Sequence, residues 1–207
     1  MEAKNYITAV CSIKNGTVAL NHVLDFADPN LPSVEFIRAA YKHYQLSYPK
    51  FYKMDDLCKL AFVASELLIK SNALSEYKKE DIAIVIANST SSLEIDTEHQ
   101  RTISDVNNYF PSPAVFVYTL PNILIGEIAI RNRIKGENTF FIFDKFDADF
   151  MSSYVNSLLN NGRAKCCITG WVDLYENNYE ALLYTVEKKG GILSIENNKQ
   201  QTEQLFK

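Results

Sequence analysis

Glycine and proline are scarce in this chain, which holds 7 glycines and 6 prolines among 207 residues. That scarcity excludes collagen-like, linker and low-complexity proteins, which are rich in these residues. Apolar residues make up 47% of the chain, which is enough to bury a substantial core at this length. We therefore expect one folded domain over residues 1–207.

Basic runs and long apolar runs are also missing. The 21 basic and 25 acidic residues are mixed along the chain, with a net charge of −4, so no segment could neutralise a row of phosphates and we expect no nucleic-acid partner. No stretch approaches the roughly 18 apolar residues that span a bilayer, and the N-terminal MEAKNYITAVCSIKN lacks the apolar core of a signal peptide. The sequence predicts a cytoplasmic protein without a membrane span.

The four cysteines show no C-x-x-C spacing, which is the usual mark of zinc and redox sites. They are Cys11, Cys58, Cys166 and Cys167. The adjacent pair would point to opposite faces of a strand. We expect buried free thiols, and the sequence contains no motif that indicates a cofactor or a metal.

Apolar periodicity predicts strands that alternate with helices. Strands are expected at 6–13, 81–88, 138–143, 164–171 and 181–188, and helices at 33–44, 54–70, 122–133 and 150–162. This order favours an α/β layered sandwich around a mostly parallel, mixed five-stranded sheet. Residues 14–50 are expected to be an irregular insertion apart from the first helix, 89–113 a polar loop, and 190–207 a frayed tail after a possible edge strand in GGILSIE.

The stretch FFIFDKFDADF, residues 140–150, is a junction between a buried strand and a helix. Such junctions favour a nucleophile, because the N–H groups at a helix N-terminus stabilise negative charge. Here they meet Lys145, flanked by Asp144 and Asp147. The aspartates favour the protonated amine and so argue against a Schiff-base or general-base lysine. Asp144, Asp147 and Asp149 could bind a divalent metal, but we favour a helix cap at Asp147 with Asp149 in the first turn.

A second polar cluster lies in EIDTEHQ. Glu94, Asp96, Glu98 and His99 could form a metal or acid/base site, although a solvated loop or a partner-contact surface explains them more simply. The other histidines, His22 and His43, have no recognisable partners and are expected at the surface.

Two segments resemble one known family. PNILIGEIAIRNRIKGENTFFIF, followed by the acidic-aromatic junction, a helix, NNGRAKCCITGW and Asp173, resembles the N-terminal half of the β-ketoacyl synthases, which have the thiolase-like fold. KMDDLCKLAFVASELLIKSN is similar to an Asp-Arg helix near the N-terminus of those enzymes. The resemblance covers most of residues 1–188 and is strongest over 121–173.

The resemblance implies that the condensing nucleophile is missing. Counted from Gly136 and from Gly162, the nucleophilic cysteine of the family would fall at Lys145. The small residues that make room for an acyl thioester are also replaced. Trp171 stands where the family has the second glycine of a Gly-Gly ending, and packing is the simpler explanation for it. The histidines and lysine of the reaction belong to the C-terminal half of the family fold, so we expect no catalysis by this chain alone, although the family class is acyltransferase.

Three functions follow from this resemblance. The first is an accessory subunit that pairs with a condensing enzyme, or with a second copy, in fatty-acid or polyene- and polyketide-like synthesis on an acyl carrier protein. The second is an independent acyl-thioester transferase or hydrolase that uses Lys145, Cys166 or the His99 cluster. The third is a module that binds an acyl chain or a carrier protein, because a lone half-fold should expose apolar surface that a partner buries.

Overall fold

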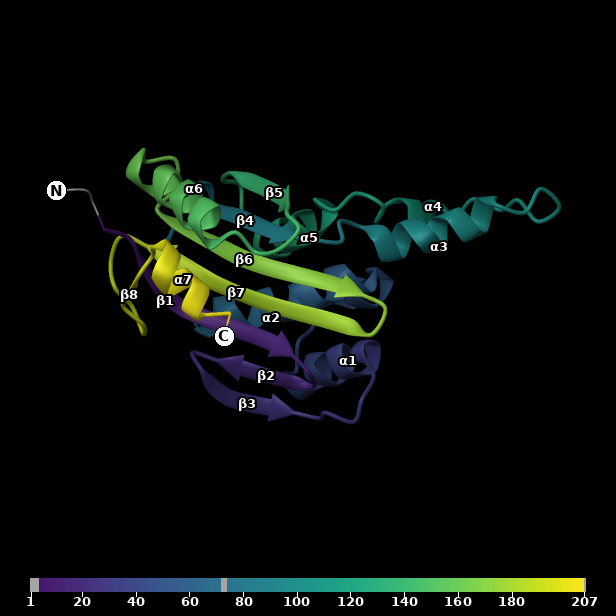
Figure 1. The fold of residues 1–207 in the computed structure, drawn as a ribbon, viewed down its shortest axis with the longest axis horizontal. Coiled ribbons are helices and arrows are strands. Elements are labelled where there is room, and N and C mark those ends of the chain that lie inside the picture. The colour runs from purple at the N-terminus through teal and green to yellow at the C-terminus, as the bar shows by residue number, and fades with distance from the viewer. Residues whose placement is uncertain (1–3, 72–73, 207) are drawn as a thin grey trace.

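The computed structural model describes residues 4–71 and 74–206 and shows an α/β fold (Figure 1). Its sheet runs in the order β3-β2-β1-β7-β6-β4-β5, and β8 also pairs with β1. The strands are β1 (Tyr6–Lys14), β2 (Thr17–Leu20), β3 (Val23–Ala27), β4 (Ile82–Asn88), β5 (Asn138–Ile142), β6 (Cys166–Tyr175), β7 (Asn178–Glu187) and β8 (Ile195–Glu196). The helices are α1 (Ser33–His43), α2 (Asp56–Ser71), α3 (Leu93–Ile103), α4 (Pro113–Phe116), α5 (Ile123–Asn132), α6 (Ala148–Asn160) and α7 (Lys199–Gln204).

Helices cover both faces of the sheet. The long helix α2 packs against β1, β6 and β7 on one face, with α1 and α5 beside it, while α6 and α7 lie on the other (Figure 1). The helix predicted at 54–70 is confirmed as α2, but it is not amphipathic in the structure, since the twelve consecutive residues 57–68 are all buried. Every residue of β4 is buried, as expected of a strand covered on both faces. The predicted α/β layered class is therefore confirmed.

The expected sheet of five mostly parallel strands is wrong in detail. Among the described residues, only the β4–β5 and β4–β6 pairs are parallel, and the other pairs are antiparallel, in a sheet of eight strands. Asn15 and Gly16, with φ of 50° and 67°, form a two-residue turn between β1 and β2. Such turns join only antiparallel neighbours. The strand at 138–143, expected to be buried, is β5 at the sheet edge and half exposed.

Three segments expected to be irregular contain further regular structure. Residues 14–50 form β2 and β3 as well as the predicted α1. The polar segment 89–113 forms α3, in which only Ile95 is buried, so its apolar pattern is weak. The strand considered possible in GGILSIE is confirmed as β8, whereas the frayed end expected after it forms α7. Asn198 caps α7 by accepting a hydrogen bond from the N–H of Gln201 at 3.0 Å.

No helix within residues 4–71 and 74–206 is both long and apolar enough to cross a membrane.

Candidate functional site

The strand-to-helix turn, residues 144–147, joins β5 to α6. Asp144, Lys145 and Asp147 are all exposed there. Asp147 accepts a hydrogen bond on Oδ1 from the N–H of Phe150 at 2.9 Å, so the predicted helix cap is confirmed. Asp149 follows in the first turn and lies 4.0 Å from Nζ of Lys199 in α7. The turn thus gives Lys145 a position beside a helix N-terminus with its side chain in solvent.

Carboxylates at the turn do not converge on a common point. Within residues 4–71 and 74–206, no group of three or more His, Cys, Asp or Glu side chains is placed to hold a metal ion. The aspartates are used for capping and for the contact with α7. The turn therefore provides no oxygen cage of the kind that a divalent cation requires.

Aromatic side chains lie beneath the turn, and a residue of the tail packs on them. Phe146 meets Trp171 edge to face at 6.1 Å, and Phe206 stacks on Phe146 with ring centroids 3.9 Å apart. Leu205 and Phe206 pack on the buried cluster that includes Leu182 and Tyr184 of β7. On the α6 side of the sheet, the tail therefore covers apolar surface together with α6.

The outer surface of α6 is polar. Asp149, Ser153, Ser157 and Asn160 are its exposed residues, apart from Phe150 near the helix start. In an amphipathic surface helix, the apolar face packs on the core and the polar face lies in solvent. The layer formed by α6 and α7 therefore ends the molecule on this face.

All four thiols are free and buried, which confirms the prediction. Burial is the main cause that raises the pKa of each one, and nearby acidic groups add to it at all four. Only the thiolate is a strong nucleophile. Cys166 lies within β6 at 0% exposure, so the structure gives no support for it as a catalytic thiol.

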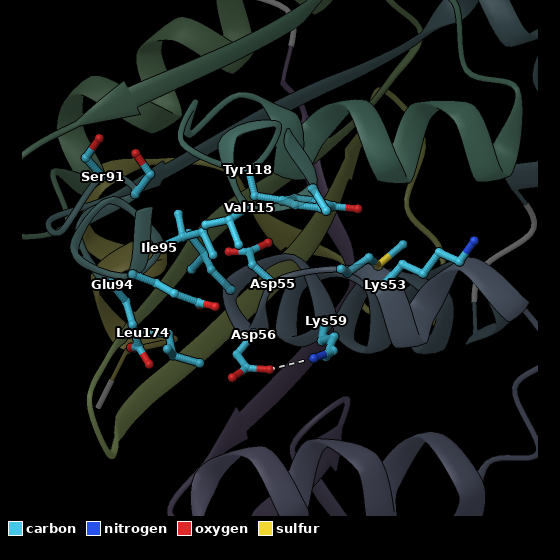
Figure 2. Close-up of a pocket in the computed structure, with 15 residues that line it drawn as sticks. Lys53, Asp55, Asp56, Lys59, Ser91, Glu94, Ile95, Val115, Tyr118 and Leu174 are labelled. Atoms are coloured by element: carbon cyan, nitrogen blue, oxygen red, sulfur yellow. Dashed lines mark hydrogen bonds and ion pairs between the residues drawn. The ribbon is translucent and has the colours of Figure 1, made fainter. Parts of the chain in front are cut away.

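A cavity of about 270 Å³ lies between the start of α2, helices α3 and α4, and the end of β6 (Figure 2). Glu94 and Glu98 of the predicted polar cluster line it, together with Asp55 and Asp56 of α2 and its cap. Asp56 pairs with Nζ of Lys59 at 2.7 Å, as the dashed line in Figure 2 shows. Asp96 and His99 are not among the lining residues, so the four predicted residues do not act as one site.

Asp55 is an ionisable residue at this cavity that the sequence did not single out, as are Asp56 and Lys59. Its Oδ1 accepts a hydrogen bond from the N–H of Cys58 at 3.3 Å, and this caps α2. Burial raises the pKa of Asp55 to about 6, against a smaller lowering by its contacts with Cys58. Burial also raises the pKa of Glu94. The sequence signal for Asp55 is its position just before a strongly apolar helix, because aspartate is a preferred helix cap.

Asp173 ties the loop after β4 to β6. Its carboxylate accepts hydrogen bonds from the hydroxyl groups of Ser89 and Thr90. Trp171, two residues earlier, is 6% exposed and belongs to the core on the α6 side. Both residues hold the ends of neighbouring parallel strands together, in agreement with the packing interpretation.

The sequence matches no known protein-family profile and no curated protein. Three solved structures resemble this chain. The ishigamide ketosynthase/chain length factor has a TM-score of 0.67 at 18% identity, over 89% of this chain and 62% of its own. A ketosynthase in complex with its chain length factor, from Xenorhabdus doucetiae, has a TM-score of 0.59 at 13% identity, over 91% and 80%.

The third structure is a type II polyketide synthase acyl-carrier protein in complex with its ketosynthase bound to the hexaketide. It gives a TM-score of 0.60 at 12% identity, over 90% of this chain and 63% of its own. The chain therefore spans less than two thirds of the length of two of these three chains. At such identities the likeness establishes the fold, which is the thiolase-like fold of ketosynthase and chain length factor proteins.

Proposed function

We propose that this chain is a ketosynthase-like accessory subunit without a condensing nucleophile of its own. It would act beside a condensing enzyme in the assembly of fatty-acid-like or polyketide-like chains on an acyl carrier protein. Similar folds are found in a ketosynthase complexed with its chain length factor and in a ketosynthase complexed with an acyl-carrier protein. The partners in those complexes are the two classes of partner that we propose for this chain, a condensing enzyme and an acyl carrier protein.

The observation that carries the proposal is the location of the reactive groups. In a fold of ketosynthase type, the strand-to-helix turn presents Lys145, and every thiol of the chain lies elsewhere, buried and with a raised pKa. A condensing enzyme needs an accessible thiolate at a helix N-terminus. We infer that Lys145 occupies the nucleophile position and that the scaffold is retained for assembly.

The alternative of an independent acyl-thioester enzyme has less support. A catalytic lysine is activated by desolvation, whereas Lys145 is exposed. The His99 ring packs 5.3 Å from the ring of Phe116. Glu94 and Glu98 line the cavity, whereas Asp96 and His99 do not, so the cluster does not form one site.

The test is purification of the tagged chain at native abundance from its own cells, followed by native mass spectrometry. We expect a heterocomplex with a thiolase-fold subunit that carries a cysteine nucleophile, and products that change when this chain is omitted from the reconstituted reaction. Turnover of acyl-carrier or coenzyme A thioesters by the isolated chain, abolished by Lys145→Ala, would overturn the proposal and favour the enzyme.

A further inference from the structure

A cavity of about 900 Å³ lies where the start of β1, helix α6 and the segment around β8 meet, and we call it the asparagine pocket. Figure 1 shows β8 and α6 near the end of the sheet at which β1 begins. Four asparagines from these segments line the pocket, Asn5, Asn156, Asn160 and Asn197. Within the described part of the chain, it shares no lining residue with the cavity at Asp55. The two are therefore separate candidate sites.

Hydrogen bonds fix how these four side chains are oriented. The amide nitrogen of Asn156 donates to the carbonyl oxygen of Asn197 at 2.9 Å. Its Oδ1 therefore faces the other way and accepts from the amide nitrogens of Asn5 and Asn197, each at 2.9 Å. The amide nitrogen of Asn5 also donates to Oδ1 of Asn160 at 3.1 Å. Since Asn5 and Asn197 are each 2% exposed, the pocket has a wall whose polar groups are held in place by buried contacts.

One acceptor of this network has no donor. The amide nitrogen of Asn5 points at Asn156 and Asn160, so its Oδ1 points away from them. This buried oxygen accepts no hydrogen bond from the described residues. Such atoms are rare in folded proteins, where nearly all buried polar groups find a partner. A hydroxyl or N–H group of a bound molecule would supply the missing donor.

Two other groups at the pocket are free donors, and one ion pair lines it as well. The amide nitrogen of Asn160 and the ammonium group of Lys188 have no partner within the described residues. Nζ of Lys4 pairs with Glu196 at 2.9 Å. A carboxylate or phosphate group brings only acceptors and would leave Asn5 unpaired, whereas an ammonium group would be repelled by Lys188. A hydroxyl group both donates and accepts, so it satisfies both kinds of partner.

The outer face of α6 is also uncharged beside the pocket. No residue of the helix after Asp149 carries a charge, although the exposed face of a surface helix usually does. Ser153 and Ser157 lie one turn apart, as do Asn156 and Asn160, and all four line the pocket. The helix thus presents a row of hydroxyl and amide groups, which match a ligand with several hydroxyl groups.

We propose that the asparagine pocket binds an uncharged polyhydroxylated molecule with the size of a mono- or disaccharide. One ligand hydroxyl donates to Oδ1 of Asn5, and other hydroxyls accept from the amide of Asn160 and from Lys188. A volume of about 900 Å³ lies within the range of about 300–1,000 Å³ that is typical of small-molecule pockets. The proposal goes beyond the accessory function and does not depend on it, because no group of the turn at 144–147 takes part.

The test titrates the full chain with D-glucose, N-acetyl-D-glucosamine, maltose, trehalose and glucose 6-phosphate, and follows the side-chain amide signals by NMR. Asn160→Leu removes the amide donor at an exposed position, and Asn177→Leu makes the same change at an exposed position of the turn between β6 and β7. Circular dichroism should report an unchanged fold in both variants. We expect at least one uncharged sugar to bind wild type and Asn177→Leu with a dissociation constant of about 1 mM or below, and to shift the amide signals of Asn5. The same sugar should bind Asn160→Leu about tenfold more weakly or worse.

Three results would overturn the proposal. Equal binding of the sugar by wild type and Asn160→Leu would place the sugar outside this pocket. No saturable binding of any uncharged sugar up to about 50 mM would mean that the asparagine network is purely structural. Tighter binding of glucose 6-phosphate than of every uncharged sugar would show that the pocket selects an anion through its lysines.

Discussion

The ring of Phe206, two residues beyond the end of α7, stacks on the ring of Phe146 in the turn before α6, with centroids 3.9 Å apart and planes 23° apart. This contact joins the far end of the chain to the turn in which the resemblance places the nucleophile of the family. It also covers the aromatic side chains beneath the turn, which include Trp171. The tail therefore completes the sheet face on the α6 side.

Replacing Phe206 should destabilise the fold without changing its architecture. Phe206→Ala removes a half-buried aromatic stack, and we expect a loss of about 1–2 kcal/mol in the free energy of unfolding. Urea denaturation followed by circular dichroism measures this loss. The control is Gln204→Ala, an exposed residue of α7. Equal stability of the two variants would mean that the stack contributes nothing in solution.

The raised pKa of Asp55 predicts a particular dependence of stability on pH. Between its ordinary value of 3.8 and its folded value of about 6, the folded state keeps a proton that the unfolded state has released. Stability due to this group is therefore fully present below the unfolded pKa and is lost as the pH rises toward 6. Asp55→Asn keeps a capping side chain and removes this loss.

The measurement is the difference in unfolding free energy between Asp55→Asn and wild type, from urea titrations between about pH 4 and about pH 7. We expect the variant to become more stable relative to wild type as the pH rises to about 6, and the difference to stay constant above that pH. The contribution of Glu94 is common to both proteins and cancels to first order. Glu203→Gln, an exposed residue of α7, is the control. A difference that stays constant over the whole range would show that Asp55 titrates alike in both states.

Thiol labelling tests whether the chain has a usable nucleophile. Iodoacetamide at about pH 8 should leave the native protein unlabelled and should label all four cysteines in urea, because only an accessible thiolate reacts. Lys145→Cys should add a single label under native conditions, since residue 145 is exposed. Labelling of native Cys166 would contradict the burial seen here and would revive the enzyme alternative.

The sequence by itself determined the elements whose pattern is local. The helix α2, the continuous apolar run of β4, the cap at Asp147 and the burial of the thiols all follow from residues a few positions apart. The sequence does not predict α3, because polar and apolar residues alternate along it without a helical period. A helix that packs little on its own chain needs no such period, and α3 buries only Ile95. The Asn15-Gly16 pair is a hairpin signal in the sequence, and it indicates the antiparallel pairing of β1 with β2.

Only the tertiary structure decided the strand order, the edge position of β5, the cavity at Asp55 and Glu94, and the closure of the turn by Phe206. Each depends on residues far apart in the chain, and a sequence period reports which face of an element is buried but not what buries it. The pKa of Asp55 and the pairing of β5 on one side only are consequences of those distant neighbours. Local patterns therefore fixed the elements, and packing among them fixed the surfaces that remain open to a partner.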